Sequence, residues 1–110
     1  MHELNLTRTL FETTMRYAEK RQVKQVNLLI GEFSDEREDA IRFHWDELAK
    51  DSLAQGAQLN FQRVDAEMQC LACETAFHPK EEFVLCPACG SQRLKLLSGD
   101  DVRLASIDVE

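Results

Sequence analysis

The sequence predicts an α+β fold, in which a small mixed sheet packs against two helices and a second lobe is inserted into the chain. Two segments carry apolar residues at helical spacing, and three others have the pattern of strands. Two C-x-x-C motifs lie within the C-terminal half. They predict an inserted lobe built from two knuckles, because a unit much smaller than about 40 residues rarely folds without a staple.

Two helices are expected. The first covers roughly residues 5 to 20, with Asn5 as its N-terminal cap. Its apolar positions are Leu6, Leu10, Phe11, Tyr17 and Ala18. The second begins with a capping pair, Asp35 and Glu38, and its segment ends at Gly56. Its apolar face consists of Ile41, Trp45, Leu48 and Ala49.

Two strands are expected before the cysteines. Apolar residues alternate from Val26 to Ile30 and predict a mostly buried strand, which Gly31 ends. Strict alternation from Ala57 to Gln62 predicts a strand with one face exposed to water. It leads directly into the cysteine lobe.

A last strand is expected after Gly99, with a bulge near Ala105 and Ser106 where the apolar alternation changes phase. The cysteine lobe is too small to offer this strand a sheet with a buried face, so we expect the strand to return to the N-terminal part. The predicted organisation is a discontinuous α+β domain of residues 1–66 and 100–110, into which a lobe of residues 67–99 is inserted.

Composition excludes several classes of function. The net charge of −7 argues against nucleic acid as a partner, because phosphate binding is driven by Lys and Arg clusters. No apolar run approaches the roughly 20 residues of a membrane helix, and no secretory signal opens the chain, so we expect a cytoplasmic protein that does not enter a membrane. No nucleophile with a visible base and no phosphate-binding glycine loop is present, and we expect no enzyme.

The four cysteines form two matched motifs, CLAC at 70–73 and CPAC at 86–89. Two thiolates from each motif give the tetrahedral shell of a closed structural zinc site. The predicted zinc ligands are Cys70, Cys73, Cys86 and Cys89, in a zinc-ribbon lobe. Four thiolates leave no open position for catalysis. Iron bound by the same four thiolates is an alternative that the sequence leaves open.

The residue after each knuckle matters, because a positive φ there turns backbone N–H groups toward the sulfurs. Gly90 follows the second knuckle and suits that conformation. Glu74 follows the first and is a poorer choice.

Met1, His2 and Glu3 place an α-amine, amide nitrogens and an imidazole within one short stretch of backbone. Such nitrogen donors suit square-planar Ni(II) or Cu(II) better than zinc. On the residues alone, a frayed terminus without function is the more common outcome.

Several segments, in order, resemble the HypA/HybF family of hydrogenase nickel-incorporation accessory proteins. They are MHEL and the helix after it, VNLLIGEFS, AIRFHWDELAK, CLAC with CPACGS, and SGDDVRLASIDVE. The resemblance runs nearly from end to end. It implies a nickel metallochaperone with Met1, His2 and Glu3 as the nickel site and the four cysteines as structural zinc ligands.

The resemblance also implies partners. These are a nickel-binding GTPase accessory protein and the large subunit of a nickel-iron hydrogenase, and some family members also serve urease maturation. An alternative from another class is a zinc-ribbon protein-interaction module without labile metal. His44 is expected to be an ordinary surface or packing histidine. His78 is expected to be an exposed loop residue, with roles as a zinc neighbour or an alternative nickel donor left open.

Overall fold

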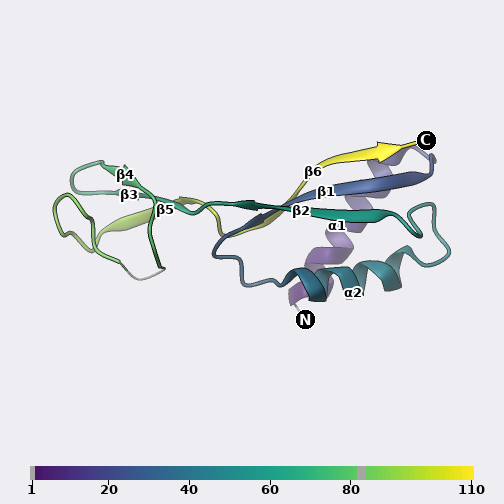
Figure 1. The fold of residues 1–110 in the computed structure, drawn as a ribbon, viewed down its shortest axis with the longest axis horizontal. Coiled ribbons are helices and arrows are strands. Elements are labelled where there is room, and N and C mark those ends of the chain that lie inside the picture. Colours follow the sequence, from purple (N-terminus) through teal and green to yellow (C-terminus); the bar gives the residue numbers. More distant parts are fainter. Residues whose placement is uncertain (1, 82–83) are drawn as a thin grey trace. The chain divides into compact units, whose positions relative to one another are not determined.

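The computed structural model describes residues 2–81 and 84–110, without the side chain of His2. The predicted α+β class is confirmed, since two helices and two three-stranded sheets are formed in these ranges (Figure 1). The elements are α1 His2–Ala18, β1 Val23–Gly31, α2 Glu38–Ala49, β2 Gln58–Val64, β3 Glu67–Cys70, β4 Ala76–Phe77, β5 Leu94–Ser98 and β6 Val102–Val109. None of the helices described is long and apolar enough to cross a membrane.

The chain forms two compact units. The first unit consists of Met1–Leu29, Glu36–Gln62 and Val102–Glu110, and it contains both helices. The second unit consists of Ile30–Asp35 and Arg63–Asp101, and it contains both cysteine motifs.

The larger sheet has the strand order β2-β1-β6, so the last strand returns to the first one as predicted. β6 runs antiparallel to β1. Gly31 donates its N–H to the Asp101 carbonyl at one end, and Glu110 donates to the Gln22 carbonyl at the other. The cysteine lobe was expected to be too small to offer the last strand a sheet. That argument was incomplete, because the lobe does have a sheet of its own, in the order β4-β3-β5.

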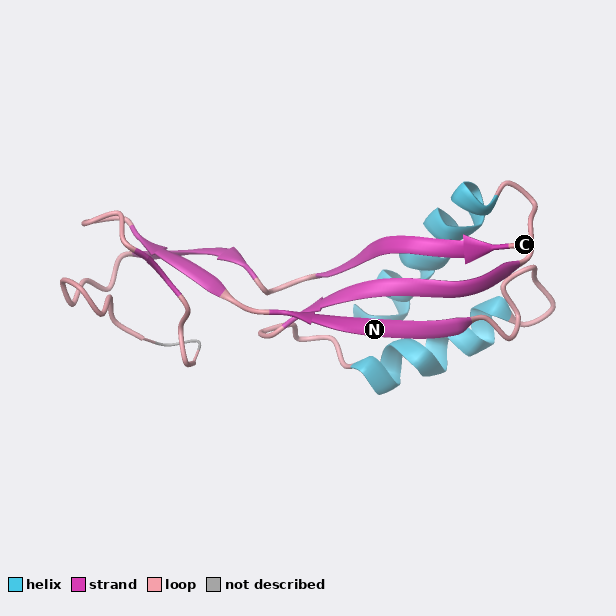
Figure 2. Cartoon of the chain, turned by 45° about the horizontal axis from the view of Figure 1, so that its top comes forward, coloured by secondary structure: helices cyan, strands magenta, loops and turns pink. Residues whose placement is uncertain are grey.

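β2 runs parallel to β1, which makes the larger sheet mixed. The Asn60 amide donates to the side chains of Gln25 and Asn27, near the start of β1. Farther along both strands, Glu32 donates its N–H to the Val64 carbonyl. Both helices cover the same face of this sheet, as Figure 2 shows.

Apolar residues of α2 anchor the core of the first unit. Ile41, Trp45 and Ala49 share one face and are buried, as expected from their spacing. Phe11 of α1 meets Trp45 edge to face, with ring centroids 5.5 Å apart. The sheet contributes Val23, Val26, Leu28, Leu59 and Val102.

The structure corrects the predicted first helix. α1 begins at His2, so Asn5 is an internal residue and not a cap; its carbonyl accepts a hydrogen bond from the Thr9 hydroxyl. Glu3 in the first turn favours this earlier start, because a carboxylate there stabilises the helix dipole. Tyr17, expected on the apolar face, has 68% of its surface exposed.

The predicted capping pair of α2 is also wrong. The N-cap residue is Arg37, in an extended conformation and without a side-chain cap. Glu38 is therefore the first helical residue, too early to complete a pair with Asp35. Acidic residues in the first turn stabilise this helix end through its dipole instead.

In the second unit, three backbone segments approach closely. A Cβ atom on Gly31 would lie 2.3 Å from the Gly99 carbonyl carbon, and one on Gly99 would lie 2.5 Å from the Ala66 Cα. Gly99 also has φ +97. Residues without a side chain are therefore required where the chain enters and leaves the cysteine lobe.

Candidate metal centre

The two cysteine knuckles have the same backbone design. In each, the residue after the second cysteine donates its N–H to the carbonyl of the first, from Glu74 to Cys70 at 2.9 Å and from Gly90 to Cys86 at 2.8 Å. Both donors have positive φ, 66° for Glu74 and 74° for Gly90. The first knuckle thus takes the predicted conformation although a glutamate occupies the position.

Backbone N–H groups point at the sulfurs inside these turns. Cys70 Sγ accepts from the N–H groups of Ala72 at 3.3 Å and Cys73 at 3.4 Å. Cys86 Sγ accepts from Ala88 at 3.4 Å. Such contacts stabilise the negative charge of a thiolate, and cysteine binds a metal cation in this deprotonated form.

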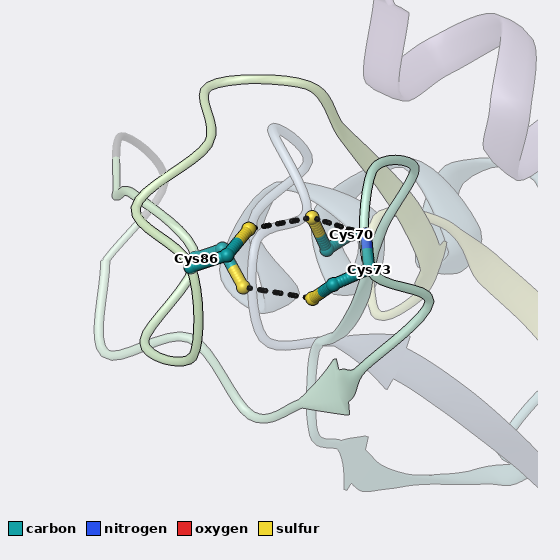
Figure 3. Close-up of side chains that lie close together, drawn as sticks. Cys70, Cys73 and Cys86 are labelled. Atoms are coloured by element: carbon teal, nitrogen blue, oxygen red, sulfur yellow. Dashed lines mark hydrogen bonds between the residues drawn. The ribbon is translucent and has the colours of Figure 1, made fainter.

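The four sulfurs form one cluster. All lie within 4.8 Å of one another, and the pairs Cys70 with Cys89 and Cys73 with Cys86 are 3.6 Å apart. Figure 3 shows Cys70, Cys73 and Cys86 turned toward one another. A tetrahedral zinc with Zn–S bonds near 2.3 Å requires sulfurs roughly 3.8 Å apart. The spacing therefore fits one tetrahedral ion.

The thiol pKa values differ within the cluster. The Cys73 N–H is the main cause that lowers the pKa of Cys70 to about 6. A hydrogen bond with the Thr75 hydroxyl lowers the pKa of Cys73. At Cys89 the Ser91 N–H lowers the pKa, but hydrogen bonding with Cys70, desolvation and the other cysteines outweigh it and raise the pKa to about 12. Four thiolates repel one another, and a divalent cation offsets that repulsion.

The cluster suits a structural metal ion and not a catalytic one. Cys70 and Cys86 are buried, whereas Cys73 and Cys89 are exposed. Within the described part of the chain, these four are the one group of three or more Cys, His, Asp or Glu side chains close enough to share an ion. Four sulfurs complete a tetrahedral shell and leave no position for a substrate.

At the other candidate site, Met1 and the side chain of His2 lie outside the described residues. Glu3 lies in the first turn of α1 and lines a hollow of about 530 Å³. Its other lining residues, Arg37, Asp39, Ala40, Phe43 and His44, belong to α2 and its N-cap. No sequence pattern predicted this hollow, because its lining comes from segments more than thirty residues apart.

The two remaining histidines have different surroundings. His44 stacks edge to face on Phe43, with ring centroids 5.4 Å apart. His78 lies outside the cysteine cluster and bonds to the Ala66 carbonyl through Nδ1 at 2.9 Å. Its Nε2 lies 3.8 Å from a carboxylate oxygen of Glu32. That oxygen also accepts the Ala66 N–H at 2.8 Å, a contact that the sequence did not predict.

Comparisons with known proteins agree with the resemblance seen in the sequence. The family model "Hydrogenase/urease nickel incorporation, metallochaperone, hypA" matches residues 1–109. The hydrogenase maturation factor HypA of Dehalococcoides mccartyi is 34% identical over 113 residues, covering 100% of this chain and 95% of that protein. The factor of the same name from Geobacter metallireducens is 34% identical over 110 residues and covers 100% of both chains.

Two solved structures share the fold. The nickel metallochaperone HypA from Helicobacter pylori superposes with a TM-score of 0.75 at 20% identity, covering 97% of this chain and 96% of that one. A second HypA solution structure gives 0.78 at 23% identity, covering 100% and 97%.

Proposed function

Because the chain belongs to the HypA family of hydrogenase nickel-incorporation metallochaperones, we propose that it binds Ni(II) at its N-terminus and helps to insert the ion into a nickel-iron hydrogenase. The observation that carries the proposal is the full-length family match together with the terminal Met1, His2 and Glu3. In this role the protein delivers a metal ion and catalyses no reaction.

The proposed nickel donors are the α-amine, nearby backbone nitrogens and the His2 imidazole, with Glu3 as the adjoining carboxylate. Nitrogen donors on successive residues suit the square-planar geometry of Ni(II). The hollow beside Glu3 is open at the surface of the first unit, which supports access by a recipient protein. Donors at the end of a chain can leave the ion one at a time, and a carrier needs such release.

We assign the four-cysteine cluster to structural zinc. The sulfur spacing, the matched knuckles and the closed four-thiolate shell support zinc, and the same shell disfavours delivery of its ion. Zinc supplies no catalytic step here; it joins the two knuckles. We further propose the cytoplasm as the location, because a reducing compartment keeps such thiolates available for a metal.

The proposed partners are a nickel-binding GTPase accessory protein and the large subunit of the hydrogenase, with urease maturation factors as further recipients. The family description, which names both hydrogenase and urease, supports these classes of partner.

The test is a calorimetric titration of Ni(II) into untagged, zinc-loaded protein and into His2→Ala. Wild type is expected to bind about one equivalent with a Kd in the micromolar range or tighter, and His2→Ala is expected to lose at least about tenfold in affinity. His44→Ala is the matched control, since it removes an imidazole from the same unit and should bind nickel like wild type.

Three results would count against the proposed donor set or the proposed function. Equal nickel binding by wild type and His2→Ala would place the site elsewhere. A loss in His44→Ala as large as that in His2→Ala would show that the donor set is incomplete and extends to His44 in the hollow. If wild type binds no nickel, the zinc-ribbon interaction module becomes the better description.

A further inference from the structure

The hollow beside Glu3 lies where the beginnings of α1 and α2 come together (Figure 1). Glu3 belongs to the first turn of α1, and Asp39 belongs to the first turn of α2. Their carboxylates therefore line one depression in the surface of the first unit. Two negative charges in one depression attract a cation toward it.

One residue of the same lining opposes that attraction. Among the described lining residues, Arg37 is the one side chain with a permanent positive charge. Its Nη2 atom donates a hydrogen bond to Oδ2 of Asp39 at 3.3 Å. Both side chains are largely exposed, and an exposed ion pair contributes little to stability because water screens the two charges. A gain in stability therefore does not explain why an arginine stands here.

The place of Arg37 in α2 does not explain the arginine either. Arg37 is the N-cap residue, a position that favours Ser, Thr, Asp and Asn because their side chains accept hydrogen bonds from the first N–H groups of a helix. A guanidinium has no acceptor, and Arg37 forms no side-chain cap. Its positive charge also lies at the positive end of the helix dipole, where a cation is unfavourable.

The charge of Arg37 thus costs the helix a favourable cap and adds a repulsion at its first turn. Natural sequences break such local rules most often at functional sites. In this chain the residue that breaks the rule lines the same hollow as Glu3, the last residue of the proposed nickel site. The arginine therefore acts most directly on a cation held beside Glu3.

We propose that Arg37 sets how loosely the N-terminal site holds nickel, because its guanidinium repels a divalent cation held beside Glu3. The inference rests on the proposed binding of Ni(II) at Met1, His2 and Glu3. Arg37 does not contact the ion; it lowers the affinity through its charge alone. A carrier benefits from such a residue, since the affinity falls while every donor to the metal is kept.

The expected effect is moderate. Where water fills the space between them, one positive charge a side-chain length away from a divalent ion changes its affinity by about fivefold. Dissolved salt weakens this repulsion, with a Debye length of about 8 Å at physiological ionic strength and about 3 Å at 1 M. A dependence on salt therefore separates an effect of charge from an effect of shape.

The test is a calorimetric titration of Ni(II) into a series of untagged, zinc-loaded variants that differ in the charge at position 37. Arg37→Gln removes the charge, and its nickel dissociation constant should be about fivefold lower than that of wild type. Arg37→Glu reverses the charge and should bind more tightly still. Arg37→Lys retains the charge and should stay near wild type. At 1 M salt the differences should largely disappear.

Arg16→Gln is the matched control. It removes the same charge from the last turn of α1, about 20 Å along the helix from Glu3, and should bind nickel like wild type. Thermal unfolding checks that every variant is folded. No loss of stability is expected in the Arg37 variants, because the arginine provides no side-chain cap.

Three outcomes overturn the inference while leaving the nickel site in place. These are equal nickel affinity in wild type and Arg37→Gln, weaker binding in Arg37→Gln, and tighter binding that 1 M salt does not reduce. Equally tight binding by Arg16→Gln and Arg37→Gln would also overturn it, because the effect would then belong to the net charge and not to the hollow. A wild type that binds no nickel rejects the proposed function and this inference together.

Discussion

At the scale of single residues, the two knuckles differ in how well their sequences suit the same backbone. Glu74 has φ 66 and Gly90 has φ 74. A side chain in this left-handed region costs roughly 1–2 kcal/mol, because its Cβ crowds the following carbonyl oxygen, and glycine avoids that cost. The first knuckle therefore contains strain that the second lacks.

Replacing Glu74 with glycine should stabilise the cysteine lobe by about 1 kcal/mol. The hydrogen bonds described for Glu74 use only its backbone. Its N–H donates to the Cys70 carbonyl, and its carbonyl accepts from the side-chain amide of Gln69, so glycine keeps both bonds. Competition with a zinc chelator should show about fivefold tighter zinc binding. Gly90→Ala should weaken binding by a similar factor. An unchanged or weaker affinity in Glu74→Gly would show that the glutamate side chain stabilises the site.

At the scale of elements, the peptide groups of one residue connect the start of β3 to two distant segments. Ala66 is 1% exposed; its N–H is bound by the Glu32 carboxylate and its carbonyl by His78. A buried N–H without an acceptor costs about 1–3 kcal/mol. Glu32 thus fixes the point where the chain enters the cysteine lobe.

Glu32→Ala should destabilise the second unit by about 1–3 kcal/mol, because it removes the acceptor of the buried Ala66 N–H. Glu32→Gln keeps an amide oxygen as acceptor and should cost much less. Thermal unfolding of zinc-loaded protein and hydrogen exchange at the Ala66 amide measure the effect. Glu67→Ala, which removes an exposed carboxylate of the same unit, is the control. Equal losses in Glu32→Gln and Glu32→Ala would assign the stabilisation to the charge beside His78.

At the scale of the whole molecule, the two units depend on different sources of stability. The first unit buries Leu28, Ile41 and Trp45 almost completely. The second has short strands, and its buried residues include Cys70 and Cys86 themselves. A metal can contribute about 10–16 kcal/mol of apparent binding energy to such a lobe.

Removing zinc with a strong chelator should therefore unfold the cysteine lobe and leave the first unit folded. Amide resonances of β3 and β5 should lose their dispersion, whereas those around Trp45 should keep theirs. Adding zinc back should restore the spectrum. Loss of dispersion throughout the chain would show that the two units fold as one, and an unchanged spectrum would show that the lobe folds without metal.

Local patterns were enough to predict most of the elements. The spacing around Trp45 predicted the buried face of α2, and alternation predicted β1, β2 and the phase change in β6. Helix ends were predicted less well. Neither Asn5 nor Asp35 is a cap. The first helix begins before Asn5, and the second begins after Arg37. In both helices, acidic residues in the first turn stabilise the N-terminal end through the helix dipole.

The sequence by itself determined the two cysteine knuckles and the resemblance to the HypA/HybF family, because both depend on residue types at fixed separations along the chain. The tertiary structure alone decided which distant residues meet. It placed Glu3 in a hollow with Asp39 and His44, and it bound Glu32 to the peptide of Ala66. Among the described residues, it also placed β6 beside β1 in the larger sheet. Periodicity reports which side of an element is buried, but only the packed chain fixes what lies opposite each side chain.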